Sequence, residues 1–190
     1  MASPSLRNSK PSKSEQRKAL LDTLNGGSLL KANAAARDIW KAGDPAYLLG
    51  ILRVLRHGRR LHNRVEAAYA LGAITGVKGT GTLEKVLSNR SENPRLRAFV
   101  AETLAHRHRP SSHNVLLRNV TDPSREVRFW CAFALGQMRE RKALPLLRVL
   151  AERDHRVVRG WWTVSKEAAD AIANITRRKG WGIRFCPLCR

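Results

Sequence analysis

The chain has 190 residues, of which 43% are hydrophobic, enough for one folded domain with a substantial core and too many for an intrinsically disordered chain. It carries 36 Lys and Arg against 15 Asp and Glu, a net charge of +21. The sequence has no apolar run approaching the roughly 20 residues that span a bilayer, and the polar segment Met1–Gln16 lacks the apolar stretch of a secretory signal. We therefore expect a cytoplasmic protein.

The net charge indicates the class of partner. A strongly basic surface attracts polyanions over a Debye length. We expect an acidic partner, either a nucleic acid or an acidic protein, rather than a membrane. The alternative is a solvated basic surface that has no specific partner, and the sequence leaves this alternative open.

The N-terminal part contains a short tail followed by two predicted helices. Residues 1–13 are basic and are expected to be disordered. Ser12 and Glu15 have the spacing of a capping box, which predicts a helix start. Ser28 is expected to cap a second helix. Residues 14–43 would then form the atypical terminal unit that covers the first repeat of a solenoid.

Residues 44–177 contain four segments of ten residues that align without gaps. The segments end at Gly72, Ala105, Gly136 and Ala173, and these ends are separated by 33, 31 and 37 positions. This period is typical of helical-hairpin solenoids. Within each segment apolar residues recur at helical spacing, which predicts one buried stripe.

Small residues also recur at fixed places in these segments. The sixth position is always alanine: Ala68, Ala101, Ala132 and Ala169. The tenth is always Gly or Ala. Small side chains let neighbouring helices approach closely, and larger ones would push the stack apart.

Partner helices are predicted before each segment, at Ala46–His57, Thr82–Leu87, His113–Val120 and Lys142–Arg153. The predicted fold is therefore all-α: a right-handed α-solenoid of about four helical hairpins with an N-terminal helical cap.

The repeat resembles a known family. Val127–Gly136 nearly completes the pattern Val-Arg-x-x-Ala-Ala-x-Ala-Leu-Gly, which resembles HEAT-like repeats of the phycobilisome-lyase type. The resemblance covers residues 44–177. Families with such repeats include phycobilin lyases, deoxyhypusine hydroxylases, alkylpurine DNA glycosylases and many scaffolds. The resemblance therefore implies a fold and leaves several functions open.

Two enzyme classes in this group make specific demands on the sequence. The hydroxylases hold iron with His-Glu pairs, whereas no histidine of this chain is followed by Glu. The glycosylases would need aromatic residues and a carboxylate near the sugar. Asp154 precedes Trp161 and Trp162, but no motif transfers residue by residue. We assign no catalytic residue and expect neither a cofactor nor a metal, and the six histidines are interpreted as surface residues.

Arginines form two candidate phosphate-binding groups. Arg64, Arg97 and Arg128 occupy the second position of three repeats, and we favour a structural role in which they bond carboxylates or carbonyls, with Asp122 a natural partner of Arg128. A second group carries no acidic residue until Glu66 and is a candidate for binding anions. Its members are Arg53, Arg56, Arg59 and Arg60 together with Arg64, and His57 and His62 belong to the same hairpin.

The last repeat is longer, and its additional residues fall near Arg159, Trp161 and Trp162. Trp beside Arg suits base stacking or a protein contact, and sealing of the last repeat is the alternative. Adjacent residues on a helix point about 100° apart. We therefore expect one Trp to be buried and the other to be partly exposed beside Arg159.

The C-terminal tail, residues 178–190, carries Cys186-Pro187-Leu188-Cys189. A structural zinc site needs four ligands, and Cys131, the remaining cysteine, is predicted to be buried.

The function that we expect is a non-catalytic HEAT-like scaffold whose basic surface binds an acidic protein or nucleic acid. The alternatives are a nucleic-acid-binding protein related to the HEAT-like alkylpurine DNA glycosylases and a phycobilin-lyase-like chaperone or lyase.

Overall fold

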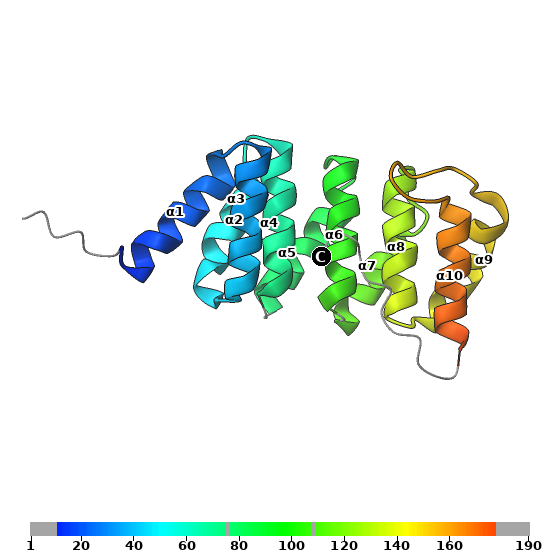
Figure 1. The fold of residues 1–190 in the computed structure, drawn as a ribbon. Coiled ribbons are helices and arrows are strands. Elements are labelled where there is room, and N and C mark those ends of the chain that lie inside the picture. The colour runs from blue at the N-terminus through cyan, green and yellow to red at the C-terminus, as the bar shows by residue number, and fades with distance from the viewer. Residues whose placement is uncertain (1–10, 75–76, 108, 178–190) are drawn as a thin grey trace, which may run out of the picture.

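The computed structural model describes residues 11–74, 77–107 and 109–177, which form five helical hairpins in a row (Figure 1). The first helix of each hairpin is α1 (Lys13–Gly26), α3 (Leu48–His57), α5 (Val77–Ser88), α7 (His113–Asn119) and α9 (Leu144–Arg153). The second is α2 (Leu29–Ala42), α4 (Leu61–Ala73), α6 (Pro94–Arg107), α8 (Arg125–Gln137) and α10 (Val164–Thr176). Short 3-10 helices precede α3, α7 and α9 at Pro45–Tyr47, Pro110–Ser112 and Arg141–Ala143.

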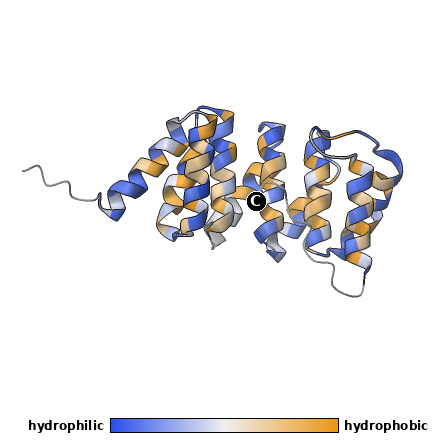
Figure 2. Ribbon diagram, in the orientation of Figure 1, coloured by the Kyte–Doolittle hydropathy of each residue, from blue (hydrophilic) through white to orange (hydrophobic). Residues whose placement is uncertain are grey.

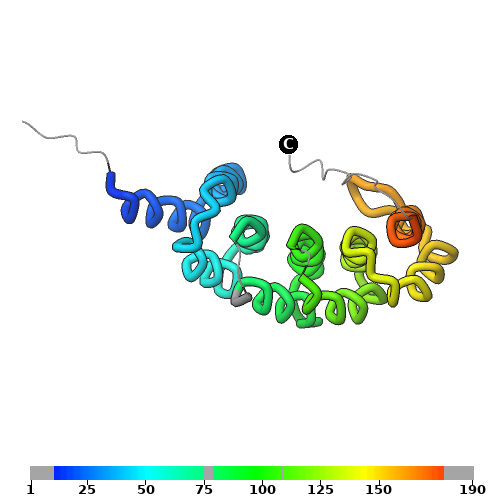
Figure 3. Tube along the Cα trace, turned by 90° about the horizontal axis from the view of Figure 1, so that it is seen from below, coloured from blue at the N-terminus to red at the C-terminus, as the bar shows by residue number. Residues whose placement is uncertain are grey.

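The helices form two curved layers. Each of α2, α4, α6 and α8 packs on the next even-numbered helix, and the odd-numbered helices cover them on one side. Figure 3 shows the resulting arc. The even-numbered helices lie along the inner, concave side, and the odd-numbered helices lie along the outer side. The described residues contain no β-strand, only an isolated bridge between Val157 and Thr163. The prediction of an all-α solenoid is confirmed.

Local sequence explains where several helices begin. Ser12 and Glu15 form the predicted capping box at the start of α1. Asp44 accepts a hydrogen bond from the amide of Ala46, and Thr163 accepts one from the amide of Lys166 at the start of α10. Ser28 occupies the cap position of α2, but its side chain makes no capping bond.

One helix is longer than the pattern indicated. A helix was predicted at Thr82–Leu87, whereas α5 spans Val77–Ser88. Its first half contains Gly79 and Gly81, which have low helix propensity. Gly79 lies close to the Leu71 side chain of α4, where a β-carbon would be only 3.1 Å from the Leu71 Cδ1. The first half of α5 is therefore helical although its local sequence does not favour a helix, and it packs against α4.

The core follows the repeat. Ala68, Ala101 and Ala132 are fully buried between neighbouring helices. Ala169 occupies the same repeat position in α10 but is exposed, because no further hairpin follows α10 in the described chain. A β-carbon on Gly136 would lie 2.8 Å from the Ala171 Cα, so glycine permits the close contact between α8 and α10.

Each helix combines hydrophobic and hydrophilic residues, with the hydrophobic ones gathered where helices face one another (Figure 2). This amphipathic pattern is what a two-layer solenoid requires. Among the described helices, none is long and apolar enough to cross a membrane.

Candidate ligand-binding pocket on the concave side

The repeated arginines bind carboxylates of the following repeat. Arg64 donates to both carboxylate oxygens of Glu92, one of them at 3.0 Å. Arg97 makes two hydrogen bonds to Asp122, the longer at 3.1 Å. Arg128 donates through Nε to Asp154 at 2.6 Å. The structural role that was favoured for these arginines is therefore what the contacts support.

Asp122 is a partner of Arg128, as expected, but through its main-chain carbonyl and not through its carboxylate. The carboxylate of Asp122 pairs with Arg97 rather than with Arg128. Arg128 instead donates to the main-chain carbonyl oxygens of Asp122 and Pro123. Spacing along the chain pointed to the nearer acid, but the stacking of repeats brings Arg128 to Asp154, the carboxylate of the next turn.

Burial and hydrogen bonding act in opposite directions on these carboxylates. Burial raises the pKa of Asp122, but hydrogen bonds from Arg97 and the Ser124 amide outweigh it, so the pKa is lowered from its ordinary value. Asp154 behaves in the same way, with Arg128 and Arg156 as its donors. Both carboxylates are ionised at neutral pH, and their charges are used within the fold. Asp154, considered above as a catalytic carboxylate, is one of these structural acids.

The second arginine group lies in the outer layer, at the end of α3 and in the turn before α4. Arg53, Arg56, Arg59 and Arg60 are all exposed. Arg56 donates to the Thr82 hydroxyl at 2.9 Å, and none of the four forms an ion pair with the part of the chain that the structure describes. We call these four residues the outer arginine cluster.

Trp161 and Trp162 lie in the loop between α9 and α10, and both are half-buried. The Trp161 ring packs edge to face on Trp130, with centroids 5.1 Å apart. The Trp162 indole N–H donates to Glu167 at 2.9 Å, and its ring lies below the Lys166 ammonium. The prediction that one of the two would be fully buried is wrong, because it assumed helical geometry for two residues that precede α10. Partial exposure of a ring beside Arg159 agrees with the position of Trp161.

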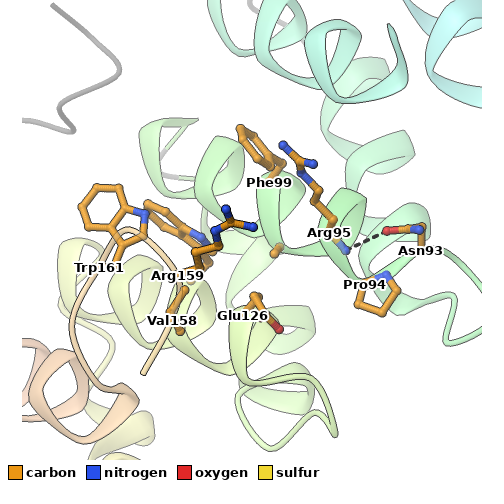
Figure 4. A pocket seen from close by; sticks show the side chains of 10 residues that line it. Asn93, Pro94, Arg95, Phe99, Glu126, Val158, Arg159 and Trp161 are labelled. Carbon is orange, nitrogen blue, oxygen red and sulfur yellow. Dashed lines mark hydrogen bonds between the residues drawn. The ribbon is translucent and has the colours of Figure 1, made fainter. Parts of the chain in front are cut away.

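A pocket of about 690 Å³ opens beside Trp161, between α6, α8 and this loop. Figure 4 shows its lining, with Arg95 entering from α6 and Arg159 from the loop. The complete lining is Asn93, Pro94, Arg95, Ala98, Phe99, Glu126, Trp130, Val158, Arg159 and Trp161. Because α6 and α8 belong to the inner layer, and the loop lies on the inner side of α10, the pocket faces the concave side of the arc (Figure 3).

Aromatic rings and cations meet in this pocket. Phe99 and Trp161 are partly exposed to it, and Trp130 is buried behind them. Arg95 and Arg159 are exposed, and neither guanidinium group has a hydrogen bond or ion pair within the described residues. The only carboxylate in the lining is Glu126, which accepts hydrogen bonds from the Ser124 hydroxyl and from Arg125.

Sequence reasoning identified Arg159 and Trp161 of this pocket but missed their partners. Phe99 and Trp130 occupy the same position, the fourth, in two successive repeats. An aromatic residue recurring at one repeat position was the available signal. Arg95 gave no signal, because it precedes the aligned segment and becomes relevant only when α6 is stacked against α8.

One buried carboxylate, Glu66 of α4, lies among polar and positive groups of α2, α4 and α6. Burial raises the pKa of Glu66, and a hydrogen bond from Asn33 and the positive charges of His62, Arg37 and Arg95 act against this rise. Arg95 therefore lies close enough to Glu66 to influence it, although no ion pair between them forms.

No group of three or more His, Cys, Asp or Glu residues that could hold a metal ion occurs in residues 11–74, 77–107 and 109–177. The histidines in those ranges are exposed or half-buried, as expected for surface residues. Cys131 is fully buried in α8, and burial raises the pKa of its thiol. Residues 1–10, His108 and the pair Cys186 and Cys189 lie outside the described residues.

Comparison with known proteins agrees with this architecture. Residues 80–165, from α5 to the start of α10, match the family described as HEAT repeats. The crystal structure of an engineered protein is similar in fold, with a TM-score of 0.53 and 21% sequence identity over 84% of this chain and 79% of that one. No curated protein matches this chain. The repeat match over residues 80–165 and the five stacked hairpins of the described residues together show a fold of HEAT-like helical repeats.

Proposed function

We propose that the protein is a non-catalytic scaffold that uses its basic surface to bind an acidic partner. The observation that carries the proposal is how the positive charge is distributed. The repeated arginines Arg64, Arg97 and Arg128 are neutralised inside the fold. Their partners are Glu92, Asp122 and Asp154. The outer arginine cluster has no such partners among the described residues and is exposed to solvent.

An acidic partner suits this distribution of charge. No acidic residue lies between Asp44 and Glu66, so the cluster has no nearby compensation along the chain. Like charges held together repel one another and lower the stability of the fold unless water or a counter-charge screens them. A polyanion would supply that counter-charge and would release its own condensed ions on binding.

The test is the salt dependence of binding to three labelled polyanions: duplex DNA, single-stranded DNA and poly-glutamate. Binding to at least one should weaken steeply as salt rises, and on duplex DNA the logarithm of the binding constant should fall by about 0.9 per phosphate contacted for each tenfold rise in salt. If the protein binds none of the three polyanions at low salt, the proposal is overturned.

A matched pair of triple variants locates the surface. Arg53, Arg59 and Arg60 changed to Glu should weaken binding strongly. Arg141, Lys142 and Arg148 changed to Glu make the same charge difference on another exposed part of the outer layer. If the two variants lose affinity equally, net charge alone drives binding and the outer arginine cluster has no special role.

A further inference from the structure

We propose that the concave pocket binds one unpaired nucleotide of a nucleic-acid strand, with its base against Phe99 and Trp161 and its phosphate between Arg95 and Arg159. This inference rests on the proposed function, because it takes the acidic partner to be a nucleic acid. It also names a site that shares no residue with the outer arginine cluster.

The aromatic wall supplies a rigid surface for a planar ligand. The Trp161 ring is held by edge-to-face contacts with Trp130, at 5.1 Å, and with Trp162, at 5.5 Å. It also contacts Phe129, with centroids 5.9 Å apart. These neighbours, of which Trp130 and Phe129 are buried, fix the ring while part of it remains exposed to the pocket. A nucleobase stacks on such a ring at little cost in side-chain entropy.

The two arginines supply the binding group for an anion. Arg95 comes from the first turn of α6 and Arg159 from the loop before α10, so they approach the pocket from different sides (Figure 4). A guanidinium group presents several N–H donors in a plane that matches phosphate. Two guanidinium groups that have no partner among the described residues and lie beside aromatic rings fit a ligand that carries both a phosphate and a flat ring.

Glu126 favours a nucleotide over other aromatic anions. Burial raises the pKa of this carboxyl, but hydrogen bonds from its own amide, Ser124 and Arg125 outweigh burial, so the pKa is lowered and the group is ionised at neutral pH. A carboxylate in the pocket repels the acidic groups of a peptide and of a nucleotide alike, but it also accepts hydrogen bonds from the amino groups of bases. A nucleotide offers the ring, the phosphate and the N–H donor together.

The position of the pocket favours an unpaired base. The rings lie between two helices and a loop, and Trp130 and Val158 in the lining are buried. A base that is paired and stacked inside a duplex cannot reach such a site without leaving the duplex, whereas a base in a single strand is free to enter.

The experiment compares two single strands of equal length and equal phosphate charge, one intact and one in which the bases are removed to leave abasic sites. Fluorescence anisotropy is measured at a fixed salt concentration. The intact strand should bind roughly tenfold more tightly, which is within the range measured for stacking of one base on an aromatic side chain. The intact strand should also bind more tightly than a duplex that carries the same label.

A charge-matched pair of variants assigns the difference to the pocket. Arg95 and Arg159 changed together to Gln should lower the ratio between intact and abasic strands, because a nucleotide without these phosphate contacts is held less well against Phe99 and Trp161. Arg141 and Arg148 changed together to Gln remove the same charge from exposed positions elsewhere and should leave the ratio unchanged. Circular dichroism checks that both variants retain the helical fold.

The outcomes separate the two proposals. Equal binding of intact and abasic strands would overturn the nucleotide pocket and leave the polyanion scaffold standing. Poly-glutamate binding without any DNA binding would overturn the pocket and leave an acidic protein as the partner. An acidic peptide containing tyrosine that displaces the intact strand through Arg95 and Arg159 would show that the pocket serves a protein ligand instead.

Discussion

Asp122 connects two repeats through a side chain that has no contact with solvent. Its carboxylate is buried against Arg97, whose side chain is only 3% exposed. Its oxygens also accept a hydrogen bond from the Ser124 amide, which begins the turn into α8. One residue thus joins α6 of one hairpin to the turn between α7 and α8 in the next, and its loss would leave the buried Arg97 guanidinium group without its hydrogen-bonded carboxylate.

Replacing Asp122 with Asn should therefore destabilise the protein by about 3–5 kcal/mol, the range for a buried ion pair that loses one partner. The control is Arg125→Gln, which removes a half-exposed pair with Glu126 and should cost less than about 1 kcal/mol. Urea denaturation measures both. Equal losses would mean that burial of the Asp122 pair contributes nothing extra.

The same carboxylates predict how stability depends on pH. Asp122 and Asp154 have folded pKa values below the ordinary 3.8. Their contribution is therefore fully present above that pH and is lost as pH falls through the lower folded values. The free energy of unfolding should decrease as the pH is lowered from 5 to 2. The free energy of unfolding of the Asp122→Asn variant should decrease less over the same interval. If the unfolding free energy of the variant decreases in parallel with that of the wild type, the assignment is contradicted.

The tryptophan pair predicts a result that differs from the initial expectation. Since both rings are half-buried and touch Phe129, at 5.9 and 6.0 Å between centroids, each should contribute to stability. Trp161→Ala and Trp162→Ala should each cost about 1–3 kcal/mol in thermal or chemical denaturation. Only Trp161→Ala should also weaken binding of the intact strand relative to the abasic one. Loss of that ratio in Trp162→Ala alone would contradict the arrangement of the pocket.

At the level of helices, the alanine of each repeat has two environments. Ala132 is fully buried between α8 and its neighbours, whereas Ala169, at the same repeat position, is exposed on α10. Ala132→Leu should destabilise by about 1–3 kcal/mol, because additional atoms in a packed interior force the backbone to move. Ala169→Leu is the matched control and should be close to neutral. A loss of stability in the control would show that something packs on the free face of α10.

Helix periodicity made most elements predictable, and tertiary contacts decided the rest. The hairpins, the capping box at Ser12 and the buried alanines follow from local patterns in the sequence. The start of α5 could not be predicted in this way. Its glycines disfavour a helix, and this part of the helix packs against α4. The partners of Arg97 and Arg128 lie 25 and 26 residues further along the chain, and only the stacking of repeats selects them.

For the whole molecule, the net charge of +21 opposes both compactness and concentration of charge on one surface. Raising salt from about 20 to 200 mM should increase the melting temperature, since mobile ions screen repulsion between exposed arginines more than attraction within buried pairs. The same change should weaken binding of every polyanion. Differential scanning calorimetry tests the first effect, and a falling melting temperature would mean that exposed ion pairs outweigh repulsion.

The concave arc links the shape of the molecule to the width of its pocket. The walls that carry Arg95 and Arg159 belong to different hairpins, with α8 between them. In a solenoid each hairpin contacts only its neighbours, so small rotations at successive interfaces add up to a change in curvature. Flattening the arc would separate the two walls, and tightening it would bring them together. A ligand bound to both walls would therefore stiffen the arc. Mechanical tension on the ends of the solenoid would separate the walls and weaken binding of the ligand.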